Sequence, residues 1–424
     1  MIFALIVVPV LGLFVGVHRY LWCRLVRDIT TPGSRPRRTG TAAAFVLPLT
    51  TLAALPAERA GAPFPLQQAL AWPGYLWLAL VLYLTLALLV GEVVRAVGLR
   101  ALRDREPAEG APSAAAPAPA PSPDPPRAPA PSSAPTLLPP RTPALPPLAV
   151  PPRRLFLARA VAAGASLAAT AAVGYGTVTT LRGPAVKRVT VPLAKLPRAA
   201  HGFRIAVVSD IHLGPILGRA HTRRVVETIN RTDPDLVAIV GDLVDGSVAD
   251  LAPAAEPLRG LRSRHGAYFV TGNHEYYSGA APWADHIREL GIHPLENART
   301  ELPGFDLAGV NDVTGQTELA GPDYDLALGG RDPSRAVVLM AHQPVTIHDT
   351  VRFGVDLQLS GHTHGGQMWP FTYVAAATNP TVAGLERYGD TQLYVTRGAG
   401  AWGPPVRLGA PPDVTVVELA SLRA

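Results

Sequence analysis

Short apolar runs recur through the second half of the chain, and each one is followed by polar residues. The runs cover residues 205–208, 236–240, 268–270, 337–340 and 357–359. The polar residues that follow them are, in order, Asp210 and His212, Asp242, Asn273 and His274, His342, and His362 and His364. Uncharged runs of this length are typical of buried strands, and parallel strands place functional groups at their carboxyl ends. The pattern therefore predicts that these side chains gather at one edge of a sheet.

The same half of the chain predicts an α/β fold. Helix-like stretches separate the strand-like runs; residues 219–231, for example, carry Val225, Val226 and Ile229 on one face. Two later runs, 393–395 and 414–417, are expected to be strands of a second sheet. The expected architecture of residues 186–424 is a two-sheet β-sandwich flanked by helices, preceded by transmembrane helices.

The first half of the chain carries longer apolar runs. Residues 1–17 are uncharged and precede several arginines, residues 42–55 are interrupted by Pro48, and residues 72–90 begin with three aromatic side chains. A signal peptide carries its basic flank before the apolar core, so residues 1–17 indicate an anchor. The arginine-rich segments at 18–40 and after residue 90 belong in the cytoplasm, which requires residues 42–55 to cross the membrane. Residues 1–103 are expected to form a membrane region with about three transmembrane helices.

The next two segments connect this membrane region to the strand-rich half. Residues 104–152 are mostly Ala, Pro and Ser, which cannot bury enough apolar surface to fold, and they predict a disordered linker. Residues 153–181 begin with Arg153 and Arg154 and continue as an Ala/Gly-rich apolar stretch. They predict either a fourth transmembrane helix or a twin-arginine-like export signal, with a cleavage site near Ala169. Both interpretations place residues 186–424 outside the cytoplasm.

Composition agrees with a membrane protein and excludes several other classes. The chain has 45 prolines, a hydrophobic fraction of 48% and a mean hydropathy of +0.19. The net charge of +6 comes mostly from arginine, but no patch alternates basic and aromatic residues, so nucleic-acid binding is not expected. Cys23 is the single cysteine, which excludes an intrachain disulfide and a cysteine-based metal site.

Five motifs, in this order, resemble those of the calcineurin-like metallophosphoesterase superfamily. They are Asp210-x-His212, Gly241-Asp242-x-x-Asp245, Gly272-Asn273-His274-Glu275, Ala341-His342 and Gly361-His362-Thr363-His364. One such residue at a strand end is more often structural than a ligand, but the five motifs together indicate a metal site. Residues 398–409 resemble the membrane-associated and exported bacterial branch, and the N-terminal segments resemble transmembrane proteins with a metallophosphoesterase domain.

The resemblance implies two divalent metal ions, with Mn, Fe or Zn suited to carboxylate, amide and imidazole ligands. It implies that the Asp242 carboxylate bridges the two ions. The other ligands of one ion would be Asp210, His212 and His364, and those of the second would be Asn273, His342 and His362. On an extended segment the alternate residues His362 and His364 point to different sides, so each is expected to reach a different ion. Asp245 is expected to be structural.

The resemblance also implies a reaction. Water activated between the ions attacks phosphorus in line with the leaving oxygen, while the metals and Asn273 stabilise the phosphoryl oxygens. His274 is the implied catalytic residue beside the leaving group, as proton donor or transition-state stabiliser, with Glu275 able to orient it. Arg397 and Arg407 have two interpretations, namely binding of a phosphate or head group, or structural pairing.

The sequence therefore predicts a multi-pass cell-membrane phosphoesterase whose catalytic domain is extracytoplasmic. The favoured substrates are phosphodiesters or pyrophosphates of lipid-linked or nucleotide-sugar envelope molecules. The alternative enzyme is a nonspecific phosphomonoesterase or cyclic-nucleotide phosphodiesterase. The alternative of another class is a catalytically silent metal-binding membrane scaffold, against which the intact ligand set argues. The substrate-binding residues and the oligomeric state are left open.

Overall fold

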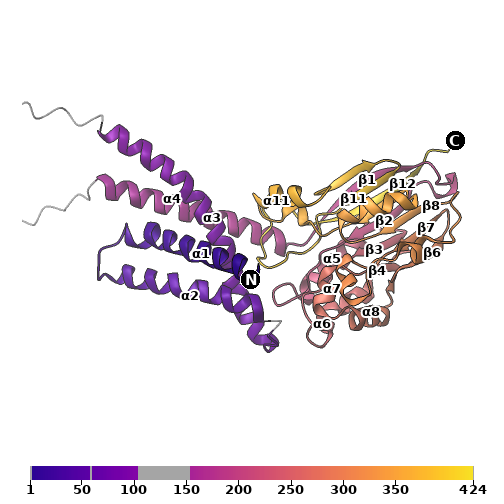
Figure 1. Cartoon of the computed structure of the whole chain (residues 1–424), viewed down its shortest axis with the longest axis horizontal. Coiled ribbons are helices and arrows are strands. Elements are labelled where there is room, and N and C mark those ends of the chain that lie inside the picture. The colour runs from indigo at the N-terminus through magenta and orange to yellow at the C-terminus, as the bar shows by residue number, and fades with distance from the viewer. Residues whose placement is uncertain (1, 58–59, 104–152, 424) are drawn as a thin grey trace, which may run out of the picture.

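The computed structural model describes residues 2–57, 60–103 and 153–423, which form a bundle of long helices and a two-sheet domain (Figure 1). The linker predicted at 104–152 lies outside the described residues. In the bundle, the elements are α1 Ile2–Trp22, α2 Arg35–Ala57, α3 Phe64–Arg103 and α4 Arg153–Leu181, and a π-helical turn Cys23–Arg27 extends α1. Within the described residues, three stretches are long and apolar enough to cross a membrane, namely 35–57, 64–97 and 153–181.

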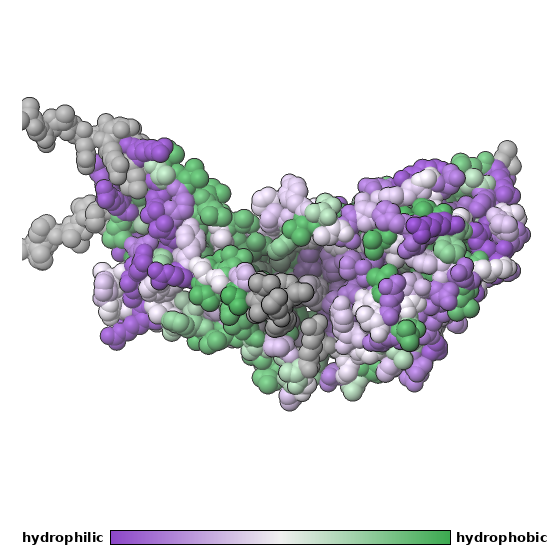
Figure 2. All heavy atoms as spheres, viewed as in Figure 1, coloured by the Kyte–Doolittle hydropathy of each residue, from purple (hydrophilic) through white to green (hydrophobic). Residues whose placement is uncertain are grey.

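Small residues let the long helices approach one another closely. The Thr51 hydroxyl of α2 donates a hydrogen bond to the carbonyl of Gly74 in α3, at 2.8 Å. A Cβ atom on Gly74 would lie only 2.8 Å from the Thr50 carbonyl oxygen, so this crossing requires glycine. Figure 2 shows hydrophobic residues along the sides of the bundle, and hydrophilic residues at its end away from the domain and over much of the domain itself.

Two six-stranded mixed sheets form the domain. The first sheet has the order β1-β12-β2-β3-β4-β5, and the second has the order β10-β11-β9-β8-β7-β6. The strands of the first are β1 Ala185–Leu193, β12 Asp413–Ser421, β2 Phe203–Val208, β3 Leu236–Val240, β4 Ala267–Val270 and β5 His293–Pro294. Those of the second are β10 Gly384–Tyr388, β11 Thr391–Val395, β9 Leu357–Ser360, β8 Ala336–Met340, β7 Phe305–Gly309 and β6 Ala298–Leu302. The predicted two-sheet α/β architecture is confirmed.

One strand lies in a different sheet from the one expected. Residues 414–417 belong to β12, which lies in the first sheet, parallel to β1 and antiparallel to β2. Its side chains are covered on both faces. Val417 packs into the core between the two sheets, and Val414 packs into the core under the helices. A strand buried on both faces gives no alternation that would assign it to either sheet.

Helices cover the outer faces of the sandwich. α5 Arg219–Asn230, α6 Val248–Ala255 and α8 Ala280–Glu289 pack on the first sheet through a core that includes Ile229 and Trp283. α9 Tyr324–Leu328 packs on the second sheet, and Ile347 of α10 Ile347–Thr350 packs against β11. Two further helices, α7 Asn273–Ser278 and α11 Phe371–Thr378, follow β4 and β9.

The domain is attached to one end of the bundle by several contacts (Figure 1). Only residues 182–184 separate α4 from β1. The Arg407 amide donates to the Gly176 carbonyl of α4 at 3.1 Å, and the Tyr83 hydroxyl of α3 donates to the Trp369 carbonyl at 3.0 Å. Phe64 at the start of α3 packs on the core beneath the first sheet's helices. The domain is therefore packed against the bundle through α3 and α4, in addition to the covalent connection between α4 and β1.

Candidate metal centre

The predicted ligands lie in the loops that follow five strands. Asp210 and His212 follow β2, Asp242 follows β3, Asn273 begins the helix after β4, His342 follows β8, and His362 and His364 follow β9. Five of them, Asp210, His212, Asp242, His362 and His364, have positive φ angles between 49° and 71°. Non-glycine residues adopt this conformation at an energetic cost, and such residues cluster at functional sites. The chain therefore bends sharply after β2, β3 and β9 and turns these side chains toward one another.

The first cluster consists of Asp210, His212 and His364, all buried, with one ligand atom of each within 4.8 Å of the others. The His212 Nε2 and His364 Nε2 atoms are 3.0 Å apart, and His364 Nε2 lies 3.4 Å from Asp210 Oδ1. The amide of His362 donates to both oxygens of Asp210 at 3.1 Å, which fixes the carboxylate between the two loops.

The second cluster consists of Asp242, His342 and His362, again with ligand atoms within 4.8 Å of one another. His342 Nε2 lies 3.1 Å from Asp242 Oδ2, and the side-chain oxygen of Asn273 lies 3.0 Å from His362 Nδ1. The same Asp242 Oδ2 atom is 3.8 Å from His212 Nε2 of the first cluster. Asp242 therefore faces both clusters, and Asn273 adds an amide oxygen to the second.

The hydrogen bonds of two histidines leave lone pairs directed into these clusters. His342 Nδ1 lies 2.8 Å from the Val240 carbonyl, so Nδ1 carries a proton, and in the neutral imidazole Nε2 is left as an acceptor. That buried Nε2 makes no hydrogen bond and faces a carboxylate oxygen, which is also an acceptor. His212 Nδ1 lies 2.9 Å from Asp245 Oδ1, which leaves Nε2 as an acceptor, 3.0 Å from His364 Nε2 and 3.8 Å from Asp242 Oδ2. Buried acceptors that face one another fit a bound cation.

Comparison with known proteins gives the family. The family model of the calcineurin-like phosphoesterases matches residues 203–366. An uncharacterized metallophosphoesterase of Bacillus subtilis is 31% identical over 283 residues, which cover 63% of this chain and 98% of that protein. The chain belongs to the calcineurin-like phosphoesterase family. The family predicted from the sequence motifs is therefore confirmed.

Two more relatives show how far the similarity extends. An uncharacterized metallophosphoesterase of Aquifex aeolicus is 33% identical, over 55% of this chain and 91% of that protein. The transmembrane protein with metallophosphoesterase domain of Danio rerio is 38% identical, over 58% of this chain and 59% of that protein. The match thus spans less than two thirds of the length of the vertebrate relative.

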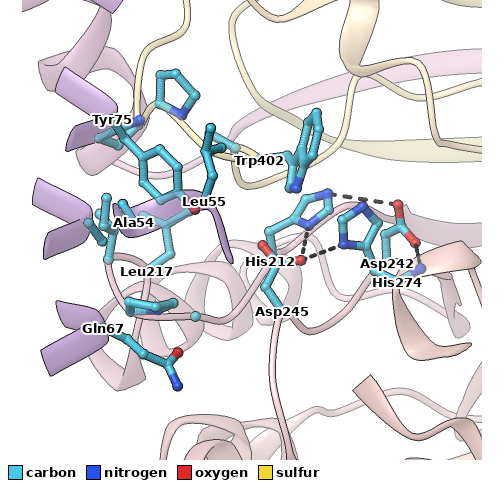
Figure 3. Close-up of a pocket in the computed structure, with 18 of the residues that line it drawn as sticks. Ala54, Leu55, Gln67, Tyr75, His212, Leu217, Asp242, Asp245, His274 and Trp402 are labelled. Carbon is cyan, nitrogen blue, oxygen red and sulfur yellow. Dashed lines mark hydrogen bonds and ion pairs between the residues drawn. The ribbon is translucent and has the colours of Figure 1, made fainter. Parts of the chain in front are cut away.

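His274 lies beside the two ligand clusters and is oriented by Asp245. Its Nδ1 atom is 2.7 Å from Asp245 Oδ1, so Nδ1 donates to the carboxylate and Nε2 is left for other contacts (Figure 3). Burial lowers the pKa of His274, but the hydrogen bond to Asp245 and its charge outweigh burial and raise that pKa to about 9. The His212 and His274 hydrogen bonds overcome the burial of Asp245 and lower its pKa to about 2. Asp245 therefore positions both imidazoles as an anion.

The expectation that Glu275 orients His274 is wrong. Glu275 is fully buried and points away from that ring, accepting hydrogen bonds from the backbone amides of Gly272, Asp242 and Leu243. It ties the loop after β3 to the loop after β4, which sets the position of Asp242 beside α7. Asp245, the second aspartate of the motif Gly241-Asp242-x-x-Asp245, orients His274 instead. The sequence favours Glu275 because it is adjacent to His274, and only the three-dimensional structure shows that Asp245 is the carboxylate that reaches the ring.

Two further expectations are decided by the local geometry. The segment with His362 and His364 is not extended, because it continues into a 3₁₀ turn His364–Gly366, yet the two histidines still face different clusters.

Arg407 has a structural role, since its buried guanidinium donates to the carbonyls of His364, Arg397 and Gly400. Burial and the Arg407 charge keep the pKa of His364 well below its usual range, so that imidazole is neutral.

A cavity of about 680 Å³ opens beside the clusters, and its walls come from both the domain and the bundle (Figure 3). At one end lie His212, Asp242 and His274. The opposite wall includes Leu55 of α2 and Tyr75 of α3, which face the metal centre across the cavity in Figure 3. The sequence motifs contained no signal for this second wall.

Proposed function

We propose that the centre holds two divalent cations, Mn, Fe or Zn, and hydrolyses phosphodiester or pyrophosphate bonds. The observation that carries the proposal is the position of the Asp242 carboxylate, which lies against His342 of one cluster and His212 of the other. Asp210, His212 and His364 would complete the ligands of one ion. Asn273, His342 and His362 would complete those of the second.

The bound ions would supply Lewis acidity, activating water and neutralising charge on the phosphoryl oxygens. The protein's own groups would control the leaving side of the reaction. As the bond from water oxygen to phosphorus forms and the bond to the leaving oxygen breaks, His274 gives that oxygen a proton from Nε2. Asp245 holds the ring through Nδ1 and stabilises its protonated form. The Asn273 amide adds a donor or ligand at the phosphoryl group.

The proposed protein is a multi-pass cell-membrane enzyme with its catalytic domain outside the cytoplasm. Arginine-rich segments at the end of the bundle away from the domain support this orientation (Figure 1). There Arg24 pairs with Glu92 of α3 at 2.6 Å, and Arg159 of α4 donates to the Ile29 carbonyl at 3.1 Å. The packing of α4 on α3 buries Ala169, which supports a retained fourth transmembrane helix over a cleaved signal.

The proposed substrates carry a lipid-linked or envelope head group. The position of the metal centre beside α2 and α3 supports this class, because the cavity wall includes residues of two candidate membrane spans. Substrates that stay in the membrane would then meet the centre without a soluble carrier.

The test uses the full chain in lipid nanodiscs with Mn²⁺ and compares bis-p-nitrophenyl phosphate with p-nitrophenyl phosphate. Faster hydrolysis of the diester is expected. A dominant rate on the monoester would contradict the proposal and favour a nonspecific phosphatase. Metal binding without turnover of either ester would favour a scaffold. In intact cells, a C-terminal reporter active only in the cytoplasm would overturn the orientation.

A further inference from the structure

Helix α3 passes in front of the metal centre and is held against the domain on both sides of it. Phe64 packs on the domain core at the start of the helix, and the Tyr83 hydroxyl binds the Trp369 carbonyl further along. The α3 residues that line the cavity between these contacts are Gln67, Ala71, Tyr75 and Leu78. Their spacing places them on one helix face, directed toward the centre. The docked helix thus forms a fixed wall of the cavity.

The end of the cavity away from the metal ligands is lined mostly by apolar residues, with Gln67 and Tyr75 as the polar side chains of α3. Leu55 of α2 and Leu78 of α3 lie on the bundle side, and Ile216, Leu217 and Pro404 lie on the domain side. Among the described residues that line the cavity, none is lysine or arginine. The described residues at this end therefore supply no cation for a second phosphate or a nucleotide, but they offer an apolar surface to a hydrocarbon group.

We propose that this apolar end binds the hydrocarbon chain of the substrate, so that the centre hydrolyses phosphodiesters of membrane lipids. The inference rests on the proposed phosphodiesterase function and adds the group that lies beside the scissile phosphate. The phosphate occupies the end of the cavity that is lined by His212, Asp242 and His274. The hydrocarbon chain extends between α2, α3 and the loop that contains Leu217.

The bundle supplies a route for such a chain. Leu55 is 53% exposed, and α2 and α3 are both candidate membrane spans, so the apolar end of the cavity is continuous with surface that faces lipid. A lipid can then place its phosphate at the centre while its chain stays in apolar surroundings, which avoids transfer of the whole chain into water. A soluble nucleotide or sugar phosphate gains nothing from this surface.

The test varies only the alkyl group of the substrate. The full chain in nanodiscs with Mn²⁺ is assayed on methyl p-nitrophenyl phosphate and octyl p-nitrophenyl phosphate, which share a leaving group. We expect kcat/KM to be at least about tenfold higher for the octyl ester, because several buried methylene groups contribute to binding. Leu55→Trp should fill the cavity and remove most of this preference, because it should lower kcat/KM for the octyl ester much more than for the methyl ester.

Leu52→Trp is the matched control, since Leu52 is also an exposed leucine of α2 but does not line the cavity. Comparing variants also cancels the partition of the octyl ester into the bilayer, which is the same for each. Leu78→Asn makes the cavity polar with little change in volume, and it should lower the octyl rate selectively even if Leu55→Trp folds poorly.

The outcomes separate this inference from the function on which it rests. Hydrolysis of neither ester by the wild type would contradict the phosphodiesterase itself. Equal kcat/KM for the two esters, or equal loss on both in Leu55→Trp and Leu78→Asn, would overturn the chain-binding site and leave the phosphodiesterase standing. A preference for the octyl ester that Leu52→Trp removes as well as Leu55→Trp would also overturn it.

Discussion

The helical bundle exposes a larger share of its large apolar side chains than the two-sheet domain does. In the domain, the large side chains Trp283 and Phe305 are fully buried, as in other proteins folded in water. In the bundle, Ala79 and Ala169 occupy the interior at 0% and 1% exposure, whereas Leu167 is 74% exposed. Helices that pack through small residues and present leucines outward are typical of proteins surrounded by lipid. The comparison indicates that the surface of the bundle suits lipid, whereas the surface of the domain suits water.

The domain differs from the bundle in a second way, because it buries carboxylates, including Asp242, that are proposed to bind metal. Asp242→Ala removes the carboxylate that faces both clusters, so bound metal should be lost and kcat/KM should fall by about 10³-fold or more. Metal content by mass spectrometry and diesterase rate measure this effect. Asp306→Ala is the control, since Asp306 is a fully buried carboxylate paired with Arg299 and Arg335. It should lower stability without removing metal, and loss of metal there would count against a local role of Asp242.

His274→Ala should separate metal binding from turnover. Because the proposed mechanism uses His274 as a proton donor and not as a ligand, metal content should stay unchanged while kcat falls by about 10²- to 10⁴-fold. Asp245→Asn should cost less, about 10- to 100-fold, because it acts through the two imidazoles. A substrate with a better leaving group, which needs no proton, should restore much of the His274→Ala rate. Loss of metal in that variant would show that His274 is a ligand.

The packing of α4 on α3 can be tested directly. Ala169→Leu forces a larger side chain into the contact between α3 and α4 and should destabilise the protein by about 1–3 kcal/mol. Leu167→Ala, two residues away and exposed, should change stability by less than about 0.5 kcal/mol. Resistance to denaturation by SDS in mixed micelles measures both. A larger effect of the exposed position would mean that α4 packs in a different orientation.

The smallest predicted effect concerns His221, a buried histidine of α5 in the domain. Burial, with added repulsion from Arg224 and Arg407, lowers its pKa to about 3. A lowered pKa means that the unfolded chain binds the proton more tightly, so stability is complete above pH 6.5 and is lost as the pH falls toward 3. Between pH 7 and pH 5.5 this amounts to about 1 kcal/mol. The pH dependence of the unfolding midpoint should be shallower in His221→Leu, and unchanged dependence would contradict a neutral buried imidazole.

Sequence alone was sufficient for the fold class and for the residues that gather at the centre, because strand ends and ligand types both appear as local patterns. It was insufficient where long-range packing decides. The position of β12 depends on partners at both edges of the strand, and the choice between Glu275 and Asp245 depends on which carboxylate reaches His274. The wall formed by Leu55 and Tyr75 depends on how α2 and α3 dock on the domain, which no motif records.

The junction between α4 and β1 has a consequence for where the enzyme can act. Only residues 182–184 connect the two elements, and Gly183, with a φ of 89°, turns the chain directly against α5 near Arg224. If α4 is retained as a membrane span, as proposed, so short a connection would keep the metal centre close to the membrane that holds α4.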